Sequence, residues 1–269
     1  MENVKQKIHR LVKIITKPEM RVLPGQIAFF LVLSIIPMLS LIGAVASKFQ
    51  ISIDSFINAL TGTMPRQVID ILVPAFNSPS FLTSASLFLG FIVASNGITS
   101  IIISSNMLFK INTRNYLLRR VKAFVMLIML VILFLIMIIV LAFGNSLLSW
   151  IFELIYNEKL PWITYYTFSI TKWVVGISIA FVMLKLLFTM APDANISSKY
   201  MNSGALITSI AWGIATFIYA IYVNNIANYN VFYGGLAGIV ALMFWVYILS
   251  YSLVVGIAVN SEVYLQKKD

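Results

Sequence analysis

Residues 123–143 read AFVMLIMLVILFLIMIIVLAF, twenty-one apolar side chains in succession without a charge. A helix needs about 20 such residues to cross the hydrocarbon core of a bilayer. The backbone of a lipid-exposed segment must pair its own polar groups, and a helix does so internally. A transmembrane β-strand would instead alternate apolar and polar residues over about ten positions. The stretch therefore predicts a membrane-spanning helix.

The composition of the whole chain extends this prediction to several spans. Of 269 residues, 60% are hydrophobic and 10% are charged, whereas a soluble domain has roughly 25% charged residues. The expected fold class is all-α, a polytopic transmembrane protein with six transmembrane helices, an N-terminal amphipathic helix and a short extracytoplasmic helix near 55–72. The six spans, in a domain over 25–262, are about 25–47, 82–109, 121–144, 164–190, 201–223 and 234–260, and 263–269 form a tail.

The first 24 residues form a separate basic segment. Apolar residues recur at helical spacing from Val4 to Ile15, which predicts an amphipathic helix at the membrane surface. Each cation near an anionic surface contributes roughly 1 kcal/mol, so we expect this helix to dock on anionic lipid. A solvated basic tail that only sets topology is the alternative. The cations are Lys5, Lys7, Arg10, Lys13, Lys17 and Arg21.

The distribution of Lys and Arg predicts the orientation. Fourteen lie in the N-terminal segment, the 110–122 and 191–200 connections and the C-terminal tail, against three in the connections on the other side. Cytoplasmic connections carry the excess of cations, so both termini are expected in the cytoplasm. Aromatic residues that suit the outer interface cluster at Trp150, Trp162, Tyr165 and Tyr166.

The side chains argue against an enzyme. The chain has no Cys, a single His at position 9 and nine scattered acids, which are few groups for metal or general-base chemistry. It has no G-x-x-x-x-G-K-[ST] phosphate loop. We expect no catalytic residues, no metal and no cofactor. The net charge is +10, and the Lys and Arg residues cluster beside hydrophobic runs. We therefore expect membrane lipids rather than nucleic acid as partners.

Polar residues within the spans are the candidates for a cavity. Lys172 lies about eight residues into the fourth span, where a charge costs roughly 2.5–3.5 kcal/mol, and Ser169 shares its face. In the second span Asn96, Thr99 and Ser100 form a polar surface. The alternatives are a snorkelling or structurally paired lysine and polar packing between helices. An interruption of the helix at Asn96-Gly97 is a further possibility.

Other residues are expected to shape the helices and their ends. Pro37 should kink the first span. Gly234 and Gly238 form a small-xxx-small pair that allows close helix contact. Tyr233 either caps a cavity or anchors at the headgroups. Glu262 follows the last span, where pairing with a basic residue is more expected than contact with a substrate.

The segment 228–264, NYNVFYGGLAGIVALMFWVYILSYSLVVGIAVNSEVY, resembles the C-terminal signature of the YihY/BrkB family of bacterial inner-membrane proteins, once labelled ribonuclease BN. The first and fifth spans are similar to the family as well. The matching positions are Ala28, Phe29, Ser34, Pro37, Pro192, Gly204, Trp212, Tyr222, Tyr229, Tyr233, Gly234, Leu236, Trp245, Tyr247, Gly256, Asn260 and Glu262. Ala258 and Gly235 depart from the family, which usually has an acid and a Ser there.

The resemblance implies six spans, a location in the bacterial plasma membrane and a role for which envelope-lipid export is one proposal. Combined with the cationic field, it favours a transporter or flippase-like exporter of an amphipathic, anionic envelope molecule. The alternative is a non-transporting scaffold that recruits envelope-synthesis partners through the basic N-terminal helix. The oligomeric state is open, and a homo-oligomer is compatible with the sequence.

Overall fold

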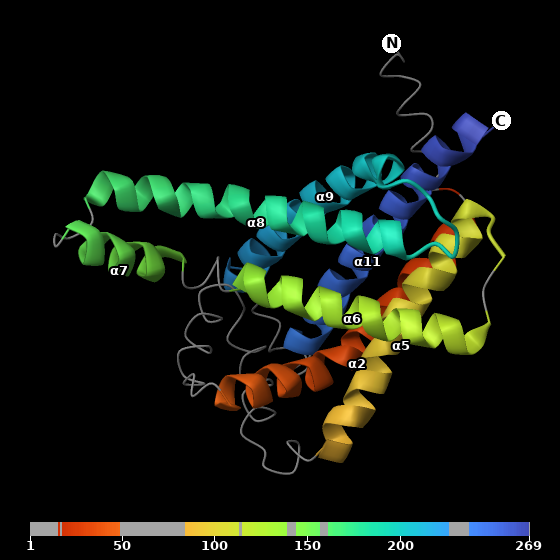
Figure 1. Cartoon of the computed structure of the whole chain (residues 1–269), viewed down its shortest axis with the longest axis horizontal. Helices are drawn as coiled ribbons and strands as arrows, with labels where there is room; N and C mark the ends of the chain where they lie inside the picture. Colours follow the sequence, from red (N-terminus) through yellow and green to blue (C-terminus); the bar gives the residue numbers. More distant parts are fainter. Residues whose placement is uncertain are drawn as a thin grey trace.

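The computed structural model describes residue 16 and residues 18–48, 84–112, 115–138, 144–156, 161–225 and 237–268. In these residues every regular element is a helix, which confirms the all-α class (Figure 1). The elements are α2 (Glu19–Lys48), α5 (Ser84–Phe109), α6 (Tyr116–Ile138), α7 (Gly144–Tyr156), α8 (Trp162–Met190), the 3-10 helix η3 (Ser198–Met201), α9 (Asn202–Asn225) and α11 (Ala237–Lys268).

In the described residues, each predicted span overlaps one of these helices. Three stretches are long and apolar enough to cross a membrane: Phe91–Phe109, Ser198–Tyr222 and Val240–Lys267. The apolar stretches Met20–Ser34 and Val174–Met190 are shorter. The chain is a helical membrane protein, and the count of six spans stays a prediction.

Some helix ends differ from the predicted boundaries, and one helix was not predicted. The first helix begins at Glu19, six residues before the predicted span, so Arg21 belongs to α2. The last helix continues to Lys268, so the predicted tail is helical up to that residue. α7 was not predicted, because the apolar run is followed by Gly144, Asn145 and Ser146, which are turn-forming residue types. Residues 1–15 and residue 17 of the N-terminal segment, and the helix near 55–72, lie outside the described residues.

α5 lies at the centre of the described helices. It packs against α2, α6 and α11, and 61% of Phe91–Phe109 is buried, compared with 22% of Ser198–Tyr222. Its inward residues join those of the neighbouring helices in one apolar core, which includes Ile27, Ile102, Leu184, Phe188 and Val254. Because every core helix contributes to this cluster, their relative positions are set by packing.

The helices expose apolar faces that suit lipid. On α6, Val121, Val125, Ile128, Ile132 and Ile136 form one exposed stripe, while Ala123, Met126 and Leu127 are buried on the opposite side. Lipid exposure of this helix, the one that carries the opening apolar stretch, is therefore limited to one face. α9 also exposes large apolar side chains along most of its length. A soluble protein rarely exposes such continuous apolar surface.

The helix ends lie on the sides expected when consecutive spans cross the membrane in opposite directions. Figure 1 shows the start of α2, the end of α5, the start of α6, the end of α8 and the end of α11 on the right-hand side of the view. We call this side the basic end, because it carries Arg21, Lys110, Arg119 and Arg120. α7 lies on the opposite side, next to the first half of α8.

Candidate functional site

A buried ion pair joins three segments near the basic end. The Lys122 ammonium on α6 donates to the Asp193 carboxylate at 2.8 Å, and the Asp193 side chain is 0% exposed. Lys122 Nζ also donates to the carbonyls of Ala191 and Pro192, at 2.9 and 2.7 Å. Asn106 on α5 donates through Nδ2 to Asp193 Oδ2 at 2.7 Å and accepts from the Asp193 N–H at 2.8 Å. We call these residues the Asp193 cluster.

The Asp193 cluster acts as a structural clamp. Both carboxylate oxygens have partners, so the desolvation cost of the buried charge is offset by an ion pair and a side-chain hydrogen bond. Lys122 also donates hydrogen bonds to the two carbonyls that follow α8. Its positive charge is favourable there, because the C-terminal end of a helix dipole is negative. The cluster therefore fixes α5 and α6 to the connection between α8 and α9.

A second polar contact joins α6 to the middle of α5. The Arg120 guanidinium donates through one terminal nitrogen to Asn96 Oδ1 and through the other to the carbonyl of Ile92, at 3.2 Å. Its Cζ lies 5.5 Å from the centroid of the Phe124 ring. The Phe124 ring stacks on Phe91 at 5.7 Å with an interplanar angle of 3°. Asn96 therefore has a cationic partner on α6.

Four hydroxyl groups of α5 are satisfied within their own helix. The hydroxyls of Ser95, Thr99, Ser100 and Ser104 donate to backbone carbonyls three or four residues earlier, at 2.8–3.1 Å. Such back-bonding is ordinary for Ser and Thr inside helices. These residues support helix packing, and they do not by themselves form a hydrophilic groove.

The interruption considered at Asn96-Gly97 is wrong. α5 continues without a break through both residues. Gly97 is buried, and a Cβ built there would lie 3.5 Å from the Leu31 side chain of α2. The small residue therefore lies where α2 packs on α5, which gives it a packing role.

The cavity predicted between the second and fourth spans, with Lys172 and Asn96 in its lining, stays a prediction, because the side chain of Lys172 lies outside the described part of the structure. α8 packs against α6, α7 and α9, whereas α5 packs against α2, α6 and α11. Figure 1 shows the first half of α8, which carries position 172, beside α7 and away from α5. The crossing of α6 over α5 brings Arg120 to Asn96.

Several other candidates lie beyond what the structure describes. Lys172 and Ser169 are in α8, Pro37 in α2 and Gly238 in α11, but the surroundings of these four are outside the described part. The helix α2 runs continuously through Pro37. Tyr233 and Gly234 lie outside the described residues. Glu262 is half-buried in α11, and its role stays a prediction.

A seam of small and polar residues joins α9 to α11. Asn260 Oδ1 accepts from the Gly204 N–H at 2.7 Å, and the Trp212 indole donates to the carbonyl of Leu249 at 3.0 Å. A Cβ on Gly204 would lie 2.1 Å from the carbonyl oxygen of Gly256. Gly204, Gly256 and Asn260 therefore allow the two backbones to approach closely, and we call them the α9–α11 seam.

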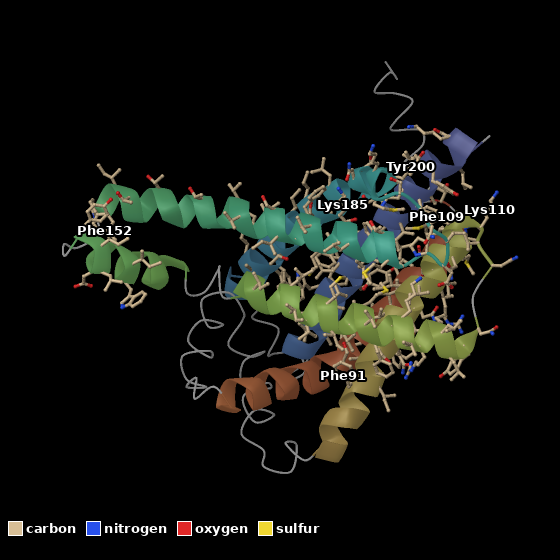
Figure 2. The ribbon with its side chains drawn as sticks, viewed as in Figure 1. Phe91, Phe109, Lys110, Phe152, Lys185 and Tyr200 are labelled. Carbon is tan, nitrogen blue, oxygen red and sulfur yellow. The ribbon has the colours of Figure 1, made fainter. Side chains whose placement is uncertain are left out.

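Tyrosines cluster at the ends of η3 and α11. The rings of Tyr200 and Tyr264 lie edge to face at 5.6 Å, and Phe109 lies 5.8 Å from Tyr264. Lys267 Nζ is 5.4 Å from the Tyr200 ring. Figure 2 shows Phe109, Lys110 and Tyr200 close together on this side of the molecule. This aromatic group holds the end of α11 against the connection between α8 and α9.

The structure identifies polar contacts that the sequence alone did not. In the sequence analysis Arg120 and Lys122 served only to predict the orientation in the membrane, and Asp193 was one of nine scattered acidic residues. Their partners come from helices distant in sequence, so no local spacing could have paired them. In the described residues, no group of three or more His, Cys, Asp or Glu side chains could hold a metal ion.

Comparison with known proteins gives a consistent set of relatives. Residues 12–269 match the family model described as virulence factor BrkB. A ribonuclease-like protein, YfkH, of Bacillus subtilis is 22% identical over 250 residues, covering 91% of this chain and 90% of the relative. A UPF0761 membrane protein of Vibrio campbellii is 26% identical over 266 residues, covering 93% of this chain and 80% of the relative. No solved structure matches the chain.

Proposed function

Since the chain belongs to the family described as virulence factor BrkB, we propose that it moves an anionic amphipathic molecule of the bacterial envelope, such as a lipid, across the plasma membrane. The proposal includes an orientation with both chain termini in the cytoplasm. In this orientation the basic end faces the cytoplasm, as the positive-inside rule requires. No catalytic activity is part of the proposal, and the ribonuclease-like description applies to the relative from Bacillus subtilis.

One observation carries the proposal: four cations at the basic end have no acidic partner among the described residues. Within the described part of the chain, Arg21, Lys110, Arg119 and Arg120 form no ion pair, while the buried carboxylate of Asp193 is used by Lys122. Unpaired cations beside an apolar exterior attract molecules that combine a negative group with hydrocarbon. A phospholipid is the most abundant molecule of this kind in a membrane.

A scaffold that recruits envelope-synthesis proteins is the rival function. It would use the same cations to bind an acidic protein surface. The exposed apolar stripes of α6 and α9 suit lipid on the outside of the helices and are not specific to either function. Isolation with a stoichiometric protein partner and without bound lipid would support the scaffold.

A leaflet assay tests the proposed transport. The purified protein is placed in phosphatidylcholine vesicles that contain a trace of fluorescently labelled phosphatidylglycerol, and dithionite is added outside. Protein-free vesicles should lose about half of the fluorescence, because only the outer leaflet is exposed to the reductant. Vesicles with protein should lose clearly more, and labelled phosphatidylcholine should respond less. Equal loss with and without protein would refute transport of this lipid down its gradient.

A further inference from the structure

The contact between α6 and α5 leaves part of a guanidinium group available. Arg120 uses its two terminal nitrogens toward Asn96 and the carbonyl of Ile92. A guanidinium has five N–H donors, so donors remain after these two bonds. The Arg120 side chain is half-buried, which leaves part of it open to a ligand.

The partners of Arg120 do not neutralise its charge. Asn96 and the carbonyl of Ile92 are neutral acceptors, whereas the cation of the Asp193 cluster has a carboxylate at 2.8 Å. A half-buried cation that is oriented but not neutralised is suited to a charge-assisted hydrogen bond with an incoming anion. Arg is also the residue whose planar fork best fits the oxygens of a phosphate.

A second arginine lies beside the first. Arg119 Nε is buried and has no hydrogen-bond partner among the described residues, and Arg119 Cζ lies 6.0 Å from the Tyr116 ring. Burying an unpaired donor costs roughly 1–3 kcal/mol. An acceptor brought by a ligand would relieve this cost. Two adjacent guanidinium groups can together surround a phosphate with donors.

Aromatic rings lie beside Arg120. The stacked rings of Phe91 and Phe124 flank its guanidinium. Arg119 and Arg120 lie seven residues before the buried Met126 and Leu127, so they are on the side of α6 that faces α5 and not on its exposed stripe. The contact therefore presents cationic donors next to aromatic rings, and hydrocarbon attached to a phosphate can pack against such rings.

We propose that Arg119 and Arg120 bind the phosphate of an anionic phospholipid whose hydrocarbon packs against Phe91 and Phe124. This proposal rests on the proposed function and names the site at which the molecule is bound. Asn96 is a positioning residue, because it orients the Arg120 guanidinium toward the α5–α6 surface. Lys172 has no part in this site.

The test is a binding measurement on the full chain in detergent. Fluorescently labelled phosphatidylglycerol is titrated against the wild type and against the double variant R119Q/R120Q, with labelled phosphatidylcholine and inorganic phosphate as the other probes. The matched control is K199Q/K267Q, which removes the same charge from the separate group around Tyr200. The single variant R119Q removes a side chain that makes no hydrogen bond within the described part, so its fold should persist.

We expect the double variant to bind phosphatidylglycerol at least tenfold more weakly, R119Q about threefold more weakly and the control within twofold of the wild type. Unchanged binding by R119Q and the double variant would overturn the proposal. An equal loss in the control would also overturn it, because the effect would then be diffuse surface charge. Displacement of the lipid by millimolar inorganic phosphate would assign the site to free anions instead.

The leaflet assay separates this proposal from the proposed function. If the wild type binds phosphatidylglycerol through Arg119 and Arg120 but does not move it between leaflets, the transport function fails and the binding site stands. If the wild type moves the lipid while R119Q/R120Q binds and moves it equally well, the site fails and the transport function stands.

Discussion

The α9–α11 seam gives the sharpest prediction about stability. A Cβ added at Gly204 would lie 2.1 Å from the carbonyl oxygen of Gly256 and 2.5 Å from Asn260 Nδ2. The backbone oxygen cannot move without its helix, so G204A must separate α9 from α11. Overpacking costs about 1–3 kcal/mol, and the lost bond from the Gly204 N–H to Asn260 costs about 1 kcal/mol more. We expect a loss of about 2–4 kcal/mol.

The chain provides a matched control and an intermediate case. Gly213 is on the same helix with nothing within 4 Å of its added Cβ, so G213A should be neutral or slightly stabilising through helix propensity. A Cβ at Gly256 would meet the side chain of Thr208 first, at 2.1 Å, and a side chain yields more easily than a backbone. G256A should therefore fall between the other two variants.

The measurement is thermal unfolding of the three variants in one detergent, followed by intrinsic tryptophan fluorescence. For a protein of this size, about 1 kcal/mol corresponds to roughly 2–4 °C in Tm, so G204A should melt roughly 5–15 °C below the wild type. A G204A variant that melts together with G213A would refute the close approach of α9 and α11.

Three further predictions concern other contacts. D193N should lower stability by about 2–4 kcal/mol in thermal unfolding, because the buried ammonium loses its counter-charge, and E153Q at an exposed position should change it little. W212F should cost about 1 kcal/mol through the lost indole hydrogen bond, whereas W150F, at a 60% exposed position, should not. Because the chain has no Cys, single cysteines report topology: K110C should react with an impermeant maleimide only from the cytoplasm and W150C only from outside.

Hydropathy predicted the positions of the helices because a membrane-spanning helix must be apolar along the length that crosses the hydrocarbon core. In the described residues each of the six predicted apolar runs overlaps a helix, and the opening stretch at 123–143 falls largely in α6. α7 was not predicted, because the residues that follow the apolar run, Gly144, Asn145 and Ser146, are turn-forming types and yet begin this helix. Helix ends moved where polar residues continue a helix beyond the apolar run, as in α11.

The candidate site was harder to predict than the fold. The sequence identified Asn96 as part of a polar surface on the second span, which either lines a cavity or packs between helices, but it named no partner for this residue. The actual partner, Arg120, depends on the angle at which α6 crosses α5, and side-chain packing rather than sequence spacing sets that angle. Resemblance to a family pointed to Gly204, Trp212, Gly256 and Asn260, and the structure explains them as the seam and its hydrogen bonds.

Native mass spectrometry of the protein isolated with its own lipids tests the central claim most directly, because it identifies the bound molecule without a chosen probe. The account predicts one anionic phospholipid per chain, retained at collision energies that remove zwitterionic lipids, and largely absent from R119Q/R120Q. A wild-type protein that retains no anionic lipid, or retains zwitterionic lipid equally well, would contradict the account.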